Sequence, residues 1–295
     1  MNNHIQLVLK SSTTEMSLND HDLGIYLVPE LDGLTGLPEI RTTSGVNAGY
    51  DGGWTSAQNF DARSITIRGV IANQDVATVE RLRKQLVSLL AQGKNEQLAL
   101  DLVTESGNAY ELQVRTIACE MAMQSVLTQQ QFMIQLRADD PLIYDNTAGT
   151  ESVIVQVQQA IGGFEINFQL PLAISGGEGE STIENAGLEK VYPVIKMYGA
   201  LHNPIFINLT TNQQFQVNVS LGYAEVDDEV RRDVLIIDSR MRTVTLNGTD
   251  VYHLIAEGSE FPMLAPGENK LMLHSDISGD NGYAEVNYKQ GYLTI

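Results

Sequence analysis

The residues of this chain that are able to support catalysis are five histidines, one cysteine and many carboxylates. The histidines are scattered singly, at His4, His21, His202, His253 and His274. A hydrolase with a nucleophilic side chain needs a base positioned beside it, and no Gly-x-Ser-x-Gly motif accompanies any of these histidines. We therefore interpret each histidine as a loop or core side chain and predict no catalytic residue.

Metal and phosphate sites are equally poorly supported by the sequence. Cys119 is the only cysteine, which excludes an intramolecular disulfide and a thiolate zinc site, and neither His-x-His nor His-Glu-x-x-His occurs. The stretch DISGDNG spaces Asp276, Ser278 and Asp280 like an EF-hand loop, but it lacks the glycine and the bidentate glutamate that calcium requires. GYDGGW (Gly49–Trp54) lacks the lysine and the following helix of a P-loop. We predict no metal and no cofactor.

Two acidic stretches raise the question of an enzyme. A glycosidase needs two carboxylates across a cleft, and EVDDEVRRD (Glu225–Asp233) is the densest acidic cluster, but its mixed charges are typical of an exposed connection. Asp238 follows four apolar residues in RRDVLIIDSRMRTVTLNG, as catalytic aspartates do at strand ends of α/β enzymes. Because TVTLNG supplies a second strand within a few residues, no crossover helix fits. We predict a β-hairpin in which Asp238 opens the turn, with a further turn at Asn247 and Gly248.

Composition limits the class of protein. The 295 residues suffice for two ordinary domains, and 43% hydrophobic residues with 25 glycines fit a folded, loop-rich chain. The net charge of −19 supplies no clustered Lys and Arg for neutralising phosphate, so we predict no specific nucleic-acid binding. Acidic surfaces would instead let a polyanion slide past without sticking. The sequence begins without a basic region and a following apolar stretch, and no window of eighteen apolar residues occurs, so we expect a soluble protein that does not associate with a membrane.

Only one segment has helical periodicity. DVATVERLRKQLVSLLAQG places six apolar residues on one stripe, namely Val76, Val79, Leu82, Leu86, Leu89 and Leu90. Asp75 is the expected N-cap and Gly93 the expected residue after the C-cap. Three basic residues, Arg81, Arg83 and Lys84, fall outside the stripe and are interpreted as a solvated face, with a basic docking patch as the alternative.

Elsewhere the apolar residues alternate with period two, which predicts a mostly β, α+β fold. The stretches SITIRGVI, QLALDLV, AYELQV and QFMIQLRA read as half-buried strands around the helix, and they predict an antiparallel N-terminal α+β domain over residues 1–145. Residues 146–184 are poor in charge and rich in Gln and Gly, and we assign them to a linker or β-hairpin extension. Residues 185–295 contain only short strands and turn signals, typical of a β-sandwich or jelly-roll.

Several of these stretches, taken in order, resemble a known family. They are GVNAGYDGGW, the helix with RLRKQLVSLLAQG, DDPLIYD, YPVIKMYG, NPIFINLTT, VLIIDSRMRTVTLNGTDV and SEFPMLAPGENKLML. The chain resembles the distal tail protein (Dit) of siphophages and prophages of Gram-positive hosts. The resemblance covers nearly the whole chain, and its most specific part is the pattern IID, V-x-L-N-G and F-x-x-L-x-P-G-x-N between Ile236 and Asn269. Residues 146–184 match least well.

This resemblance implies a structural protein of the virion and no enzyme. In such a protein the N-terminal domain closes into a homo-hexameric ring, in single or stacked rings, and the C-terminal domain is a galectin-like β-sandwich. The ring joins the tail tube protein to the tail-tip hub or tail-associated protein at the virion tail tip, lets DNA pass, and presents a platform for a receptor-binding protein. Assembly would take place in the cytoplasm of the bacterial host. The long stretch from Met1 to Arg63, without helical periodicity, is able to wrap a neighbouring subunit in such a ring.

The alternative function is a carbohydrate-binding module that recognises host cell-surface glycans, because sandwiches of this kind bind sugars on exposed aromatic rings. The C-terminal domain offers seven tyrosines, Tyr192, Tyr198, Tyr223, Tyr252, Tyr283, Tyr288 and Tyr292, and no tryptophan, since Trp54 lies in the other domain. The third hypothesis is a cell-wall hydrolase, which no recognisable set of catalytic residues supports.

Overall fold

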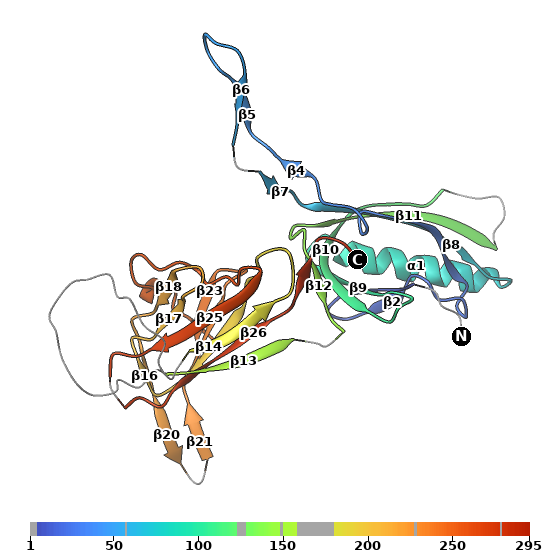
Figure 1. Ribbon diagram of the computed structural model, residues 1–295. Helices are drawn as coiled ribbons and strands as arrows, with labels where there is room; N and C mark the ends of the chain where they lie inside the picture. Colours follow the sequence, from blue (N-terminus) through green and yellow to red (C-terminus); the bar gives the residue numbers. More distant parts are fainter. Residues whose placement is uncertain are drawn as a thin grey trace. The chain divides into compact units, whose positions relative to one another are not determined.

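The computed structural model describes residues 5–56, 58–122, 128–147, 150–157, 180–226, 229–277 and 279–295. The chain divides into two compact units, which we call the N-terminal unit (residues 1–147 with 292–295) and the C-terminal unit (residues 148–291). Both units consist mainly of antiparallel strands, and the described residues contain a single α-helix, in the N-terminal unit (Figure 1). The predicted fold class, mostly β with one α-helix, is confirmed.

A seven-strand antiparallel path forms the sheet of the N-terminal unit. Its order is β2 (Glu15–Ser17), β1 (Gln6–Lys10), β9 (Leu98–Val103), β10 (Ala109–Glu120), β11 (Gln129–Ala138), β8 (Arg63–Ala72) and β3 (Ile25–Asp32). Two short strands, β12 (Ile143–Asp145) and β27 (Gly291–Tyr292), pair with each other, and β12 also pairs with β10. The four strands predicted from alternation around the helix are all present, as β8, β9, β10 and β11.

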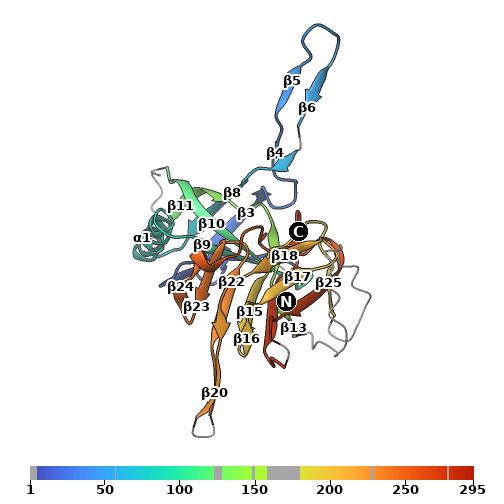
Figure 2. The same ribbon diagram turned by 90° about the vertical axis from the view of Figure 1, so that its left-hand side faces the viewer.

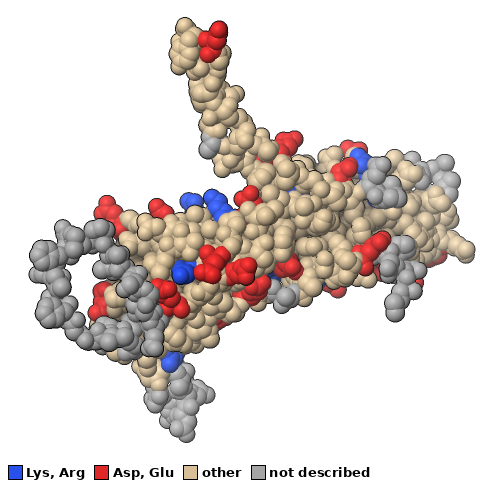
Figure 3. Space-filling view, in the orientation of Figure 1, with Lys and Arg blue, Asp and Glu red and all other residues tan. Residues whose placement is uncertain are grey.

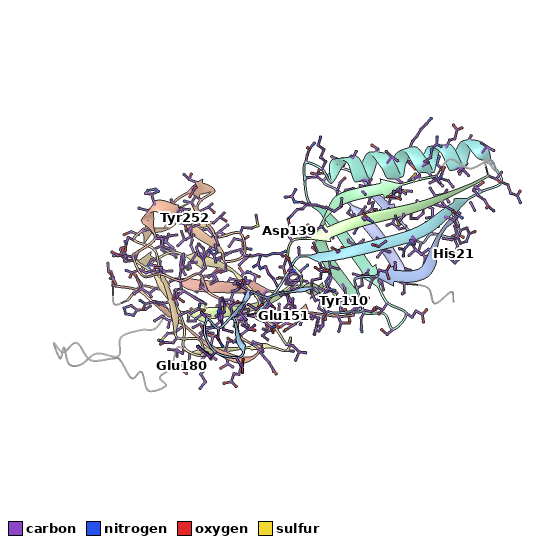
Figure 4. The ribbon with its side chains drawn as sticks, turned by 90° about the horizontal axis from the view of Figure 1, so that it is seen from above. His21, Tyr110, Asp139, Glu151, Glu180 and Tyr252 are labelled. Carbon is purple, nitrogen blue, oxygen red and sulfur yellow. The ribbon has the colours of Figure 1, made fainter. Side chains whose placement is uncertain are left out.

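The helix α1 (Val76–Gln92) covers one face of this sheet (Figure 4). Its predicted N-cap is confirmed, because the Asp75 carboxylate accepts hydrogen bonds from the amides of Ala77 and Thr78. The apolar stripe is buried apart from the partly exposed Val76 at its start. Together with the inward residues of the strands it forms one core. No helix in the described part of the chain is long and apolar enough to cross a membrane.

The end of the helix differs from the expectation in one detail. Gly93 caps it, but with φ −60° this glycine is in the right-handed region and not in the left-handed region typical of a residue after the C-cap. A Cβ at this position would lie 2.4 Å from Thr116 Oγ1 and 2.8 Å from Leu98 Cδ1. Glycine is therefore needed here for close packing against the sheet.

Two antiparallel sheets form the C-terminal unit. The larger runs β13 (Glu151–Gln156), β26 (Tyr283–Tyr288), β15 (Val194–Tyr198), β22 (Val234–Asp238), β23 (Thr243–Leu246) and β24 (Thr249–Asp250). The smaller runs β14 (Ser181–Asn185), β25 (Gly267–His274), β17 (Ile205–Asn208) and β18 (Gln213–Gln216). Buried side chains alternate along the strands of both sheets, for example Ile195 and Met197 on β15 and Phe206 on β17, which is the pattern of a β-sandwich core.

Smaller elements complete this unit. Two further antiparallel pairs join β16 (Leu201–His202) to β19 (Ser220–Leu221) and β20 (Tyr223–Val226) to β21 (Glu229–Arg232). A short 3₁₀ helix, η1 (Tyr252–Leu254), lies where the sequence predicts strands only. Of the segment 146–184, assigned to a linker or hairpin, β13 and most of β14 are strands of the two sheets, and residues 148–149 and 158–179 lie outside the described residues.

Candidate functional site

An extended arm is the most exposed feature of the N-terminal unit. It consists of residues 37–61 and contains two strand pairs, β4 (Ile40–Arg41) with β7 (Asn59–Phe60) and β5 (Ser44–Val46) with β6 (Gly53–Thr55). Figures 1 and 2 both show it standing away from the sheet of this unit. Backbone hydrogen bonds such as Ser56 N–H to Thr43 O and Asp61 N–H to Glu39 O keep its two sides paired between the short strands.

Large apolar side chains on the arm face solvent. The exposed fraction is 86% for Val46, 71% for Tyr50 and 52% for Trp54. Trp54 is paired with Gly45, and its indole covers that glycine so closely that a Cβ there would lie 2.8 Å from the ring. Figure 3 shows few charged side chains along the arm, with an acidic group near its tip. Exposed apolar groups gathered on a narrow projection are typical of a surface that another chain covers.

The base of the arm is fixed by Arg63, the first residue of β8. This side chain is only 2% exposed, and its guanidinium donates to four backbone carbonyls. Two acceptors, Gly33 O and Gly36 O, lie where the chain enters the arm, at 2.5 and 3.0 Å. The others are Pro141 O at 2.9 Å and Leu293 O at 2.6 Å. One side chain therefore joins the arm, the segment before β12 and residues 292–295.

Burial lowers the pKa of Arg63 from its ordinary value, yet a guanidinium stays protonated at neutral pH. No carboxylate bonds this guanidinium among the described residues, so carbonyl dipoles alone compensate the buried charge. The sequence reasoning missed this residue, although a signal was present. Arg63 is in phase with Ile65 and Ile67 along the alternating pattern, which places it on the core face of β8.

The histidines singled out in the sequence lie in different surroundings. His4 lies outside the described residues, and His21, His253 and His274 lie on separate segments, namely the turn before β3, η1 and the end of β25. His202 is different, because its Nδ1 lies 3.0 Å from Asp280 Oδ2, and its backbone amide donates to Ser275 Oγ at 2.8 Å. The Ser275 hydroxyl is in hydrogen-bond contact with the same carboxylate oxygen of Asp280. The fold thus assembles a serine, an aspartate and a histidine that the sequence keeps far apart.

This cluster is arranged to hold loops together and not to activate a nucleophile. In a hydrolase the imidazole lies between the serine and the carboxylate, so that it takes the serine proton. Here Asp280 lies in the middle and bonds both partners. Burial by itself raises the pKa of Asp280, but the hydrogen bonds from Ser275 and His202, with the charge of His202, outweigh it and hold the pKa below its ordinary value. At neutral pH the carboxylate therefore serves as an ionised acceptor that ties β16 to the segment after β25.

The other acidic stretches are DISGDNG and EVDDEVRRD, and each is described only in part. No group of three or more His, Cys, Asp or Glu residues among those described is arranged to hold a metal ion. Ser278 of the DISGDNG stretch lies outside the described residues, and Asp276 accepts a hydrogen bond from Asn203 Nδ2 at 2.8 Å. The acidic cluster EVDDEVRRD coincides with the β20–β21 hairpin, whose residues 227–228 lie outside the described residues.

The hairpin around Asp238 is as predicted. Asp238 Oδ1 accepts hydrogen bonds from the amides of Arg240 and Met241, at 3.0 and 2.8 Å, and so opens the turn between β22 and β23. Asn247 and Gly248 have φ of 48° and 83°, the left-handed pair of a two-residue hairpin turn between β23 and β24. The carboxylate of Asp238 is used by the backbone, as expected of a residue that opens a turn.

The P-G-x-N part of the motif has a structural explanation. Asn269 is fully buried, and its side chain donates to Ala265 O and Gly267 O and accepts from the Ala265 amide, at 2.7, 3.0 and 2.9 Å. A second buried side chain, Asn208, donates to Asn269 Oδ1 at 3.1 Å and to Met263 O at 2.8 Å. These two asparagines fix the turn before β25 from inside the unit.

Comparison with known proteins gives a family match for the part of the chain that contains these turns. Residues 200–292 match the family described as siphovirus-type tail component, C-terminal domain. The resemblance to siphophage distal tail proteins is confirmed. The match contains the Asp238 hairpin, the Asn247–Gly248 turn and the asparagine-fixed turn at Gly267. None of the curated proteins matches the chain.

Solved structures share the fold over nearly the whole chain. The Dit protein of phage SPP1, described as a paradigm of the hub adsorption apparatus in phages that infect Gram-positive bacteria, superposes with a TM-score of 0.61 at 13% identity. That alignment covers 96% of this chain and 98% of SPP1 Dit. A component of the phage P2 baseplate in its activated conformation aligns over 99% of this chain and 100% of its own length, with a TM-score of 0.51 and 10% identity. At these identities the likeness shows the fold.

Proposed function

We propose that this chain is a structural, non-enzymatic distal tail protein that forms a hexameric ring at the tip of a siphophage tail. The observation that carries this proposal is the family match of residues 200–292 within a fold shared with SPP1 Dit over 96% of the chain. A hub of an adsorption apparatus is built from repeated copies, so its subunits must present self-complementary or head-to-tail surfaces.

Two features of the N-terminal unit fit such assembly. The arm exposes Val46, Tyr50 and Trp54, which lose contact with water only if another chain covers them. The strand β3 pairs with β8 along one side and with no other described strand, and on its second edge only the start is covered, by the bonds of the Ile25 and Leu27 amides to Asp20 O and Asn19 Oδ1. Open edges and exposed apolar groups favour aggregation in an isolated chain, and closing copies into a ring removes both.

The proposed partners follow from the place of such a ring in the virion. On one side it contacts the tail tube protein and on the other the tail-tip hub or tail-associated protein, and the C-terminal unit is the platform for a receptor-binding protein. The ring sits at the virion tail tip after assembly in the bacterial host cytoplasm. A net charge of −19 supports passage of DNA through the ring without binding, because like charges repel along the path. A lumen lined mainly by Lys and Arg would contradict this part of the proposal.

The first test is the native mass of the purified full chain, by light scattering after gel filtration, with negative-stain images of the same peak. We expect six or twelve subunits in rings with an open lumen. A monomer that persists at high protein concentration and shows no rings contradicts the proposal.

A matched pair of variants then tests the arm. The double variant Val46→Ser with Tyr50→Ser removes two exposed apolar groups of the arm, and Leu188→Ser with Met241→Ser removes two in the C-terminal unit that are 82% and 66% exposed. We expect the first pair to abolish rings without changing the melting temperature, because the side chains make few contacts within the subunit. The second pair should leave rings intact. Equal effects of the two pairs on ring formation would exclude a specific role of the arm.

A further inference from the structure

A groove of about 780 Å³ lies entirely within the C-terminal unit. Its walls come from the segment before β15, from β18, from the β22–β23 turn, and from η1 with the segment that follows it. The volume falls within the range of about 300–1,000 Å³ that is usual for small-molecule sites. Neither the proposed function as a tail protein nor the description of the matched family assigns a ligand to this groove.

One wall of the groove is a row of three aromatic rings. Phe215 is fully buried, Phe261 lies 4.8 Å from it between ring centroids, and Tyr252 lies 6.3 Å from Phe261 with the two rings inclined by 29°. Tyr252, labelled in Figure 4, is 52% exposed. It is the exposed one of the seven tyrosines of this region, since the other six are buried or partly buried. The row therefore anchors an exposed ring to the core, and such a ring offers a rigid apolar face to a ligand.

The groove also carries positive charge in an acidic protein. Lys190 and Arg242 are exposed and form no ion pair with any residue that the structure describes. The Lys190 ammonium lies 6.0 Å from the centre of the Tyr192 ring. Arg242 projects from the turn that Asp238 fixes, and its own φ is 54°. Two cations without an ion-pair partner in one groove of a chain with net charge −19 favour an anionic ligand there.

Uncharged hydrogen-bonding groups lie between the aromatic and the basic residues. Gln213 Nε2 donates to Glu260 Oε2 at 3.2 Å and Gln213 Oε1 accepts from Thr211 Oγ1 at 3.1 Å, which leaves the second carboxylate oxygen of Glu260 available for a ligand. Ser239, at the floor, is 2% exposed, and its hydroxyl makes no hydrogen bond with a described residue. A ligand rich in hydroxyl groups would supply the partners that these side chains lack.

The edge of the neighbouring strand is closed to a polypeptide. The carbonyls of Gln214 and Gln216 on β18 accept hydrogen bonds from the amides of Glu260 and Ala256, at 2.9 and 3.0 Å, and the Gln216 amide donates to Ser259 Oγ. An incoming strand cannot add to β18, so an occupant of the groove contacts side chains and not the sheet edge.

We propose that this groove binds a saccharide that carries negatively charged groups, with a sugar ring against Tyr252 and the anionic group between Lys190 and Arg242. Flat apolar faces of sugar rings pack on aromatic side chains, their hydroxyls bond amides and carboxylates, and a carboxylate or phosphate pairs with the two cations. Because the groove lies within one unit of one chain, ligand binding there is separable from ring assembly.

Titration calorimetry on the full chain tests this with three probes. They are a tetrasaccharide of galacturonic acid, a hexose oligomer joined by phosphodiesters, and a neutral galactose tetrasaccharide. We expect at least one anionic probe to bind at least tenfold more tightly than the neutral one, with an affinity that falls as salt is added. The anionic probe that binds tells whether a carboxylate or a phosphate is recognised. Failure of all three probes to bind, or equal binding of neutral and anionic probes, overturns the proposal.

Substitutions locate the site on the chain. Tyr252→Ala, and Lys190→Ala with Arg242→Ala, should each lower the affinity at least tenfold. The matched controls are Met241→Ala, in the same turn as Arg242 but outside the groove, and Lys270→Ala, an exposed cation on β25. Ser239→Ala should lower the affinity by a smaller factor at an unchanged melting temperature, since no hydrogen bond of the free protein is lost. Controls that weaken binding as much as the groove variants would overturn the assignment of this site.

Discussion

Arg63 in the N-terminal unit and Asn269 in the C-terminal unit each secure an irregular segment, but by different chemistry. In the N-terminal unit one buried cation, Arg63, bonds four carbonyls that come from three distant parts of the chain. In the C-terminal unit the neutral side-chain amide of Asn269 bonds backbone groups over a shorter stretch, at the turn that contains Ala265 and Gly267. Both side chains are almost completely buried.

The number of chain segments that one buried side chain connects depends on its donors, its acceptors and its charge. An asparagine both donates and accepts, so it completes a local turn and leaves no charge in the interior. A guanidinium only donates, through a rigid fork, and its charge must be surrounded by acceptors on several sides. Arg63 therefore depends on all four acceptors at once, and the arm, the segment before β12 and residues 292–295 depend on Arg63. We expect the N-terminal unit to be the more sensitive to one substitution.

The strongest test removes the buried cation. Arg63→Met keeps the approximate length of the side chain but leaves four buried carbonyls without a donor, and we expect it to lower the free energy of unfolding by at least about 3 kcal/mol. Urea denaturation measures this. Arg68→Met is the matched control on the same strand, because Arg68 pairs only with Asp32 at the surface and its loss should cost less than about 1 kcal/mol.

A second variant separates charge from geometry. Arg63→Lys keeps the charge but lacks the fork, so we expect most of the loss seen with Arg63→Met. If the Arg63 and Arg68 variants had equal free energies of unfolding, the four buried hydrogen bonds of Arg63 would add no more stability than a surface ion pair. That result would contradict the role given to Arg63.

Substitution of Asn269 tests the C-terminal half of the comparison with Arg63. Asn269→Ala removes the hydrogen bonds that close the turn before β25, and we expect a loss of about 2 kcal/mol. Asn208→Ala should cost a similar amount, and the double variant should cost less than the two together because the side chains bond each other. Asn218→Ala, an exposed site in the same unit, is the control. Strict additivity would contradict a shared network.

The smallest expected effect concerns the cluster of His202, Ser275 and Asp280. Since the pKa of Asp280 is lower in the folded than in the unfolded chain, its ionised form stabilises the fold above about pH 4, and this contribution is lost as the pH falls through the folded pKa. We expect Asp280→Asn to be less stable than the parent by about 1 kcal/mol at pH 6, with the difference shrinking toward pH 2. Melting temperatures across this range measure it. Asp22→Asn, at an exposed site, is the control, and a difference between Asp280→Asn and the parent that stays constant with pH would contradict the role given to the carboxylate.

Elements whose burial follows a simple period were predictable from the sequence. The stripe from Val79 to Leu90 gave α1 with its N-cap, and alternation gave β8 to β11. The Asp238 hairpin was predictable because the spacing of its two strands leaves no room for a helix. Its turn residues, Asp238 and Asn247, carry their own backbone preferences.

The rest depends on contacts that no local pattern contains. The arm strands are exposed on both faces, so they show no alternation, and the pairing of β1 with β9 joins segments almost a hundred residues apart. His202 and Asp280 meet because the pairing of β17 with β25 brings the segment before β17 beside the segment after β25. The groove likewise unites Lys190, Arg242 and Tyr252, which are scattered single residues in the sequence. Arg63 is the exception, since its phase along β8 placed it in the core.

The contact between Arg63 and Leu293 also has a consequence for biosynthesis. Residue 293 is made only after the whole C-terminal unit, residues 148–291, which takes roughly 7 to 30 s at about 5–20 residues per second. During that interval Arg63 has one acceptor fewer, and the base of the arm lacks one of its four attachments. The N-terminal unit therefore reaches its final structure only once residue 293 has been made, and nascent chains on one messenger are less able to join through their arms before then.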